Sequence, residues 1–150
     1  MSKTLTSSDD KQTEAFARKI GSKLRGSEVI ELVADLGGGK TTFVRGLADG
    51  IESNDHVSSP SFTICNEYMG KNLQLIHFDF YRLEQAGLIA NSLVEFLGRP
   101  AVVVVIEWAD IIKQTLPEKR LSINFKVINE TSRQLKLTYP QSLSYLLEGL

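Results

Sequence analysis

The order of apolar and polar residues predicts a chain in which strands and helices alternate. Short apolar or alternating runs, bounded by glycine, proline and polar residues, are typical of strands. Such runs occur at residues 29–34, 62–69, 73–80, 102–106, 121–128 and 134–139. Apolar residues with helical spacing follow Asp10 and also occupy residues 40–50, 82–97, 108–115 and 142–148. The pattern therefore predicts an α/β fold.

Two features of this pattern constrain the sheet. Residues 102–106 are apolar without interruption, which predicts a strand covered on both faces. Short polar turns at residues 70–72 and 129–131 separate two pairs of predicted strands. Each pair is therefore expected to form an antiparallel hairpin.

Residues 29–47 contain a predicted strand, a glycine-rich turn and a predicted helix, in the order that a phosphate-binding P-loop requires. Three consecutive glycines allow the backbone N–H groups of the turn to point inward, towards an anion at the positive end of the helix. Lys40 is expected to reach the β- and γ-phosphates, and the Thr41 hydroxyl to bind Mg²⁺. The alternative is a glycine turn that precedes Lys-Thr-Thr by chance, but the flanking strand and helix then have no explanation.

Two later predicted strands carry carboxylates at their ends. Asp79 lies near the end of residues 73–80, and Glu107 directly follows residues 102–106. Ligands of open α/β sheets bind beyond the carboxyl ends of the strands, so both acids can converge on the P-loop. Asp79 is the better candidate for the Mg²⁺ side, and Glu107 for orienting the attacking water or binding the metal. The sequence leaves the two roles open, and either acid alone also fits a capping or ion-paired residue.

Other residues have both a functional and a structural interpretation. Residues 58–63 (SSPSFT) are expected to form either a mobile loop that senses the γ-phosphate or a polar turn before a strand. Trp108 either stacks on a base or covers the sheet edge, and the second interpretation is slightly favoured. His77 is expected to pack against the sheet, and Cys65 to be a packed thiol rather than a nucleophile.

Composition narrows the class of protein. A chain of 150 residues with 42% apolar and 23% charged residues is expected to form a single domain over residues 1–150. No apolar run is long enough to span a bilayer, and residues 1–20 lack the core of a signal peptide, which favours a cytoplasmic protein. The formal net charge of −1 provides no basic field for a long phosphate backbone, so a partner is expected to hold any nucleic acid.

Four motifs occur together along the chain: residues 35–46 (DLGGGKTTFVRG), 59–63 (SPSFT), 77–83 (HFDFYRL) and 106–110 (IEWAD). In order and spacing they resemble the TsaE family, formerly called YjeE, of bacterial ATPases in tRNA threonylcarbamoyladenosine biosynthesis. A P-loop alone is weak evidence, whereas the set of four is specific. The resemblance spans essentially the whole chain.

This resemblance implies a P-loop NTPase fold, which is a three-layer sandwich with a mainly parallel central sheet, antiparallel hairpin strands and helices on both faces. It also implies weak intrinsic ATPase activity, with ATP/ADP and Mg²⁺ as ligands. The expected partners are TsaD and TsaB, which place threonylcarbamoyl on the adenosine beside the anticodon. The chain is therefore expected to contact tRNA only indirectly, through its complex with these two partners.

Carried over residue by residue, the resemblance gives three groups of site residues. The expected catalytic residues are Lys40, Asp79 and Glu107, and the expected metal ligands are Thr41, Asp79 and Glu107. The expected nucleotide-binding residues are Asp10, Leu36, Gly37, Gly38, Gly39, Lys40, Thr41, Thr42, Ser59, Thr63, Trp108 and Arg133.

The chain departs from the family pattern at three places. Ala34 stands where the first P-loop glycine is usual, and Ser61 stands where threonine is usual. Because these residues keep a small size and a hydroxyl, the site is expected to survive both changes. Residues 84–91 (EQAGLIAN) lack the usual acidic helix start, which concerns the partner-facing surface more than the nucleotide site.

Two other functions are compatible with a P-loop. A small-molecule kinase usually adds a lid with several arginines, but residues 82–100 contain only Arg82 and Arg99, which weakens this alternative. A nucleotide-gated binding module with negligible turnover would use ATP only to order residues 59–63.

Overall fold

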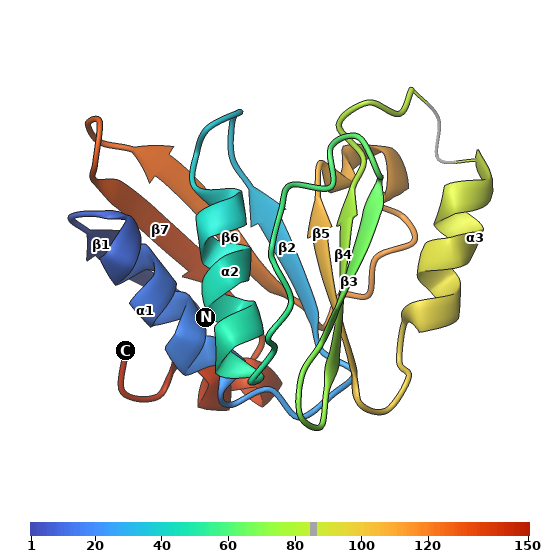
Figure 1. Cartoon of the computed structure of the whole chain (residues 1–150), viewed down its shortest axis with the longest axis horizontal. Helices are drawn as coiled ribbons and strands as arrows, with labels where there is room; N and C mark the ends of the chain where they lie inside the picture. The colour runs from blue at the N-terminus through green and yellow to red at the C-terminus, as the bar shows by residue number, and fades with distance from the viewer. Residues whose placement is uncertain (85–86) are drawn as a thin grey trace.

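The computed structural model describes residues 1–84 and 87–150 (Figure 1). The strands are β1 (Ser2–Ser7), β2 (Val29–Val33), β3 (Cys65–Met69), β4 (Gln74–Asp79), β5 (Val102–Glu107), β6 (Leu121–Val127) and β7 (Arg133–Thr138). The helices are α1 (Asp10–Gly21), α2 (Lys40–Gly50) and α3 (Gly87–Phe96), with the 3₁₀ helices η1 (Ala109–Ile112) and η2 (Gln141–Leu147). None of these helices is both long enough and apolar enough to cross a membrane.

The strands form one sheet in the order β1-β7-β6-β2-β5-β4-β3. The four central strands, β6, β2, β5 and β4, run parallel to one another. β3 and β4 form one antiparallel hairpin, and β6 and β7 form the other. The predicted α/β fold and both predicted hairpins are therefore confirmed.

Apolar side chains cover both faces of the central strands. On β5, Val103 and Val105 belong to the core beneath α1, α2 and η2, whereas Val104 and Ile106 belong to the core beneath α3 and η1. Figure 1 shows α1 and α2 side by side over the sheet, with α3 towards its other end. The prediction of a strand covered on both faces is thus confirmed for β5.

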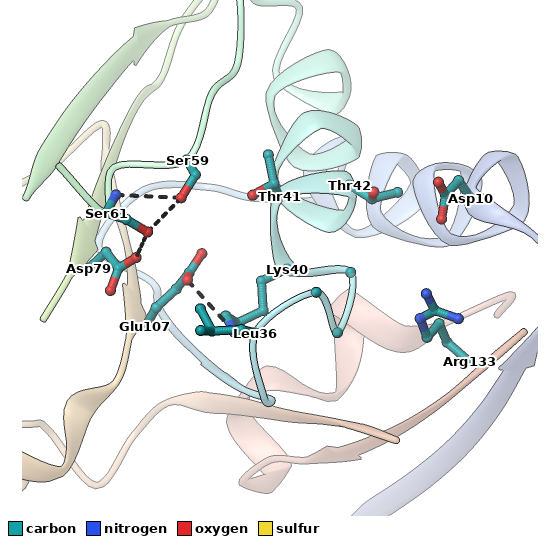
Figure 2. Close-up of a pocket in the computed structure, with 13 residues that line it drawn as sticks. Asp10, Leu36, Lys40, Thr41, Thr42, Ser59, Ser61, Asp79, Glu107 and Arg133 are labelled. Atoms are coloured by element: carbon teal, nitrogen blue, oxygen red, sulfur yellow. Dashed lines mark hydrogen bonds and ion pairs between the residues drawn. The ribbon is translucent and has the colours of Figure 1, made fainter. Parts of the chain in front are cut away.

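Close packing of α1 on α2 depends on glycine. A Cβ on Gly46 of α2 would lie 2.6 Å from the Ala17 Cβ and would also press on the Glu14 carbonyl oxygen of α1. No side chain fits in this space, so the two helices can approach closely only through a glycine. The contact holds the first residue of α1, Asp10, near the same edge of the sheet as the start of α2 (Figure 2).

β1 is a strand that the apolar pattern does not predict. The pattern assigns residues 6–10 only to the polar segment before a helix. Within Ser2–Ser7, Leu5 is the one large aliphatic residue, so the alternation is too weak to indicate a strand. The segment is extended because its backbone pairs with β7, from Ser2 opposite Thr138 to Ser7 opposite Arg133.

Other elements differ from the prediction in their bounds or type. β3 begins at Cys65 rather than at Phe62, because a turn closed by the Ile64 N–H donating to the Pro60 carbonyl precedes it. The helices predicted at residues 108–115 and 142–148 are the 3₁₀ helices η1 and η2. The helix predicted at residues 82–97 corresponds to α3, and residues 85–86 of that prediction lie outside the described residues.

Candidate functional site

The turn between β2 and α2 has a backbone that favours glycine. Gly37 and Gly39 have φ angles of 75° and 104°, in the left-handed region. A Cβ on Gly38 would lie 2.6 Å from the Ala34 Cβ, so a side chain at residue 38 would collide with this alanine. Ala34 in place of the usual first glycine is therefore accommodated by Gly38, and α2 begins directly after the turn.

The Lys40 side chain folds back over this turn. Its Nζ donates to the carbonyl oxygens of Ala34 and Asp35, at 3.0 and 3.1 Å. The ammonium is also 4.0 Å from Glu107 Oε2, and Lys40 is only 6% exposed. A buried positive charge beside unpaired donors at a helix N-terminus attracts an anion to this turn.

The two predicted carboxylates are neighbours. Asp79 ends β4 and Glu107 ends β5, and the parallel register places them opposite each other. They are only 2% and 3% exposed. The Asp79 carboxylate accepts from Ser61 Oγ at 2.8 Å and from the Tyr81 N–H at 2.9 Å, while Glu107 lies beside Lys40.

The turn, the lysine and the carboxylates line one cavity of about 240 Å³ (Figure 2). The lining residues are Asp10, Leu36, Gly37, Gly38, Gly39, Lys40, Thr41, Thr42, Ser59, Ser61, Asp79, Glu107 and Arg133. The fold thus brings together all the residues expected at the site except Thr63 and Trp108, together with Ser61 of the predicted loop at residues 58–63.

The cavity extends to both sides of Lys40. Figure 2 shows Asp79 and Glu107 on one side of this lysine, and Asp10 and Arg133 on the other. The acidic groups at the strand ends are therefore separated from the α1 side by the glycine turn and the start of α2.

Arg133, the first residue of β7, borders the glycine turn. Its Nε is 3.8 Å from the position that a Cβ on Gly39 would occupy. Nη1 donates to the carbonyl oxygens of Asn129 and Ser132, at 2.9 and 3.0 Å, which orients the guanidinium. The Nε–H is buried beside the glycine turn, and no group in the part of the chain that the structure describes accepts a hydrogen bond from it.

The loop at residues 59–63 is linked to the acidic side of the cavity. Ser59 Oγ is 2.9 Å from Ser61 Oγ, which in turn donates to Asp79. Phe62, in the same loop, is 80% exposed. A chain of hydroxyl contacts therefore connects the Asp79 carboxylate to a loop with an exposed aromatic side chain.

Thr63 and Trp108 lie outside the cavity. Thr63 Oγ1 donates to Asn66 Oδ1 at 2.8 Å, so the hydroxyl is engaged within its own loop. The Trp108 ring packs against the Tyr81 ring at 4.9 Å, and Lys40 Nζ is 5.1 Å from the centre of the indole. Trp108 thus lies beside Lys40 without lining the cavity.

Comparison with known proteins identifies the same family as the four sequence motifs do. The sequence model of the family described as "Threonylcarbamoyl adenosine biosynthesis protein TsaE" matches residues 7–135. The chain belongs to the TsaE family. That match extends from before Asp10 to beyond Arg133, so it includes every residue that lines the cavity. The resemblance seen in the four motifs is therefore confirmed.

Individual relatives carry the TsaE name as well. A Bacillus subtilis protein named "tRNA threonylcarbamoyladenosine biosynthesis protein TsaE" is 36% identical over 127 residues, which are 85% of this chain and 79% of the relative. A Nostoc protein of the same name is 35% identical over 133 residues, 87% of this chain and 82% of the relative. The crystal structure of Bacillus subtilis YdiB matches with a TM-score of 0.81 and 31% identity, covering 99% of this chain and 93% of that chain.

One polar residue beside this TsaE-family site, His77, is absent from the predicted site residues, whereas Ser61 lies within the loop that the sequence predicted at residues 58–63. His77 Nε2 is 2.8 Å from Glu107 Oε1, whereas the sequence suggested only that His77 packs against the sheet. Alternation along β4 is the signal that was available, because His77 and Asp79 are two residues apart and share a face. That signal becomes informative only when β5 is known to be the neighbouring strand.

Cys65, at the start of β3 in this TsaE-family chain, should react slowly with thiol reagents. Burial, with a smaller contribution from the negative charge of Glu67, raises the pKa of the Cys65 thiol to about 11. At pH 8 only about one thiol in a thousand is then ionised, and the reactive thiolate increases about tenfold per pH unit up to pH 10. Stopped-flow labelling with DTNB between pH 8 and 10 would measure this rise.

The unfolded chain provides the control for Cys65. In guanidinium the thiol returns to its ordinary pKa of about 8.5, and labelling at pH 8 should be about 100-fold faster or more. Equal rates for the folded and unfolded protein at pH 8 would contradict the assignment of a protected, packed thiol.

Proposed function

We propose that this TsaE-family protein binds ATP in the cavity between the glycine turn and the ends of β4 and β5, and hydrolyses it. One observation carries the proposal: a glycine turn, a buried lysine and two buried carboxylates converge on the same cavity. Its role would be that of the ATP-driven component in tRNA threonylcarbamoyladenosine biosynthesis, the process for which its relatives are named. The fold is accordingly proposed to be a three-layer P-loop NTPase.

The phosphates would bind at the glycine turn. Backbone N–H groups at the first turn of a helix have no partner within the helix, so those at the start of α2 are free to donate to phosphate oxygens. Lys40 would exchange its two carbonyl acceptors for oxygens of the β- and γ-phosphates. The left-handed backbone at Gly37 and Gly39 leaves room for the close approach of these oxygens.

Thr41 and Asp79 are the residues that would hold Mg²⁺, and Glu107 is the neighbouring carboxylate. Hydroxyl and carboxylate oxygens are ligands that suit this ion, which commonly takes one or two carboxylates together with phosphate oxygens and water. The burial of two adjacent carboxylates supports the fit, because such a pair needs compensating positive charge. A Mg²⁺ ion held by these residues would supply that charge and would stabilise the charge that develops on the phosphate oxygens.

The two carboxylates differ in how they are held, which suggests a division of roles. Both oxygens of Asp79 already accept hydrogen bonds, from Ser61 and from the Tyr81 N–H, so this carboxylate is fixed at the metal side. Glu107 Oε2 is 4.0 Å from Lys40 and remains able to accept a hydrogen bond from a water. We therefore assign Glu107 to orienting the attacking water in line with the γ-phosphate.

The nucleoside would lie on the far side of Lys40 from the carboxylates. Asp10, Thr42 and Arg133 line this part of the cavity (Figure 2). The buried Nε–H of Arg133 is a donor that the described part of the chain leaves unpaired, which supports a polar contact to the nucleotide here. The preference for adenine comes from the family resemblance.

TsaB and TsaD are the partners that we propose, and the cytoplasm is the proposed location. The formal net charge of −1 gives this chain little attraction for an RNA backbone. Binding to tRNA is therefore assigned to the partner proteins, and this chain would act on them through its nucleotide state.

The positions of Arg82 and Arg99 weaken the kinase alternative, because a kinase would need arginines of this segment over the phosphates. The Arg82 guanidinium stacks on the Phe62 ring at 3.9 Å, and that of Arg99 lies 5.3 Å from the Phe96 ring centre. Neither arginine lines the cavity, so neither is positioned as a lid residue over the phosphates.

The proposed function is tested by measuring phosphate release from MgATP, with the protein alone and with purified TsaB and TsaD. We expect slow release by the protein alone and faster release when both partners and tRNA are present. Phosphate that appears on an added metabolite instead of in solution would favour the kinase. Binding of ATP by calorimetry without release in any mixture would favour the nucleotide-gated binding module.

A further inference from the structure

We propose that His77 positions the Glu107 carboxylate at the cavity wall and thereby sets the rate of hydrolysis without contacting the nucleotide. The inference rests on the proposed ATPase function, because Glu107 has its role on the attacking water only in that reaction. His77 is accordingly a positioning residue.

His77 and Glu107 meet on the face of the sheet that α1 and α2 cover. His77 of β4 lies opposite Val105 of β5, and Glu107 is two residues farther along β5 on the same face. The Nε2 and Oε1 atoms are 2.8 Å apart. His77 has no exposed surface, so the contact is shielded from water.

The hydrogen bond explains why a histidine occupies this apolar strand. A carboxylate only accepts hydrogen bonds, so His77 Nε2 donates and the hydrogen is assigned to that nitrogen. Nδ1 is buried and has no partner among residues 1–84 and 87–150, which costs stability relative to an apolar side chain of similar size. Within the described residues, the contact with Glu107 is the one hydrogen bond of the ring.

The two oxygens of Glu107 face different surroundings. Oε1 is held by His77, while Oε2 faces Lys40 at 4.0 Å. When the Lys40 ammonium binds a phosphate, its attraction for Glu107 Oε2 becomes weaker. The hydrogen bond between His77 and Glu107 Oε1 does not involve Lys40 and is unaffected. Since a glutamate has three rotatable side-chain bonds, an anchor on one oxygen restricts where the other can point. His77 therefore does for Glu107 what Ser61 and the Tyr81 N–H do for Asp79.

Two substitutions of His77 by an amide side chain distinguish its effect on the position of Glu107 from its effect on packing. His77→Gln keeps a donor N–H near the place of Nε2, within reach of Glu107. His77→Asn carries the same amide on a side chain one carbon shorter, near the place of Nδ1, where it does not reach Glu107. Both variants bury one amide at the same site, so their thermal unfolding midpoints should fall by similar amounts.

Steady-state hydrolysis of MgATP, measured with TsaB and TsaD present, should distinguish the two variants. We expect His77→Asn to lower kcat about 10- to 100-fold while KM stays within about threefold of the wild-type value, as for other residues that orient a metal or water ligand. His77→Gln should keep kcat within about fivefold of wild type. Equal losses of kcat in both variants, or no loss in either, would overturn the proposal.

Crystal structures of both variants without nucleotide provide a readout that is independent of hydrolysis. Glu107 should keep its side-chain dihedral angles in His77→Gln and change them in His77→Asn. An unchanged Glu107 in His77→Asn would show that the histidine does not hold it. If the wild-type protein releases no phosphate but Glu107 moves as expected, the proposed ATPase function fails and the positioning contact is supported.

Discussion

The Lys40→Ala substitution should weaken ATP binding about 100-fold or more. Lys40 contributes the buried ammonium at the glycine turn, and its carbonyl acceptors at 3.0 and 3.1 Å hold it where the phosphates would lie. Hydrogen bonds from a charged donor contribute about 1.5–3 kcal/mol each, and an alanine offers no replacement. Isothermal titration calorimetry with ATP and Mg²⁺ measures the change in Kd directly.

Lys71→Ala is a matched control for this experiment. The Lys71 side chain is 68% exposed, and its Nζ is 4.0 Å from the carboxylate of Glu52 on the surface. An exposed pair of this kind contributes about 0–1 kcal/mol, so both stability and ATP affinity should remain close to wild type. If a folded Lys40→Ala variant bound ATP with a Kd within about threefold of the wild-type value, the assignment of the glycine turn to ATP binding would be wrong.

The Glu107→Ala substitution should leave ATP binding nearly intact and lower turnover about 10²- to 10⁴-fold. The phosphates are assigned to the glycine turn and Lys40, so most of the binding energy does not depend on this carboxylate. Loss of a group that orients water affects the chemical step instead, and kcat falls with it. Calorimetry and phosphate release on the same preparation give both quantities.

Two further variants sharpen the test of Glu107. Glu107→Gln keeps the shape of the side chain and an oxygen that accepts from His77 Nε2, but removes the charge, so it should lose turnover as Glu107→Ala does. Glu118→Ala removes an exposed carboxylate that lies outside the cavity and should hydrolyse ATP at the wild-type rate. Unchanged hydrolysis in Glu107→Ala would reject the proposed role.

Prediction from the sequence was most successful where the relevant residues are contiguous. The strand, the glycine turn and the start of α2 follow one another between Val29 and Lys40, so their order is visible in the chain itself. The same holds for the hairpin turns and for the apolar run of β5, which is buried on both faces. These features depend on local backbone preferences and on burial, and both determine which residue types follow one another along the chain.

Prediction was weaker where partners are distant in the sequence. β1 was missed because its pairing with β7 depends on backbone groups, which any residue carries. Thr63 was expected in the cavity, but the turn before β3 directs its hydroxyl to Asn66. Trp108 has a positive φ of 55° and packs beside Tyr81, an orientation that no local pattern indicates.

The linear chain already specified the chemical groups of the site, including the glycine turn, the lysine and the carboxylates at the strand ends. Folding then determined which of these groups touch: Asp79 opposite Glu107, His77 against Glu107, and Arg133 beside Gly39. The reason is that periodicity reports which face of a strand is buried, but not which strand lies next to it. Packing of the whole domain decides the order of strands in the sheet. This order brings the separate motifs together around one cavity.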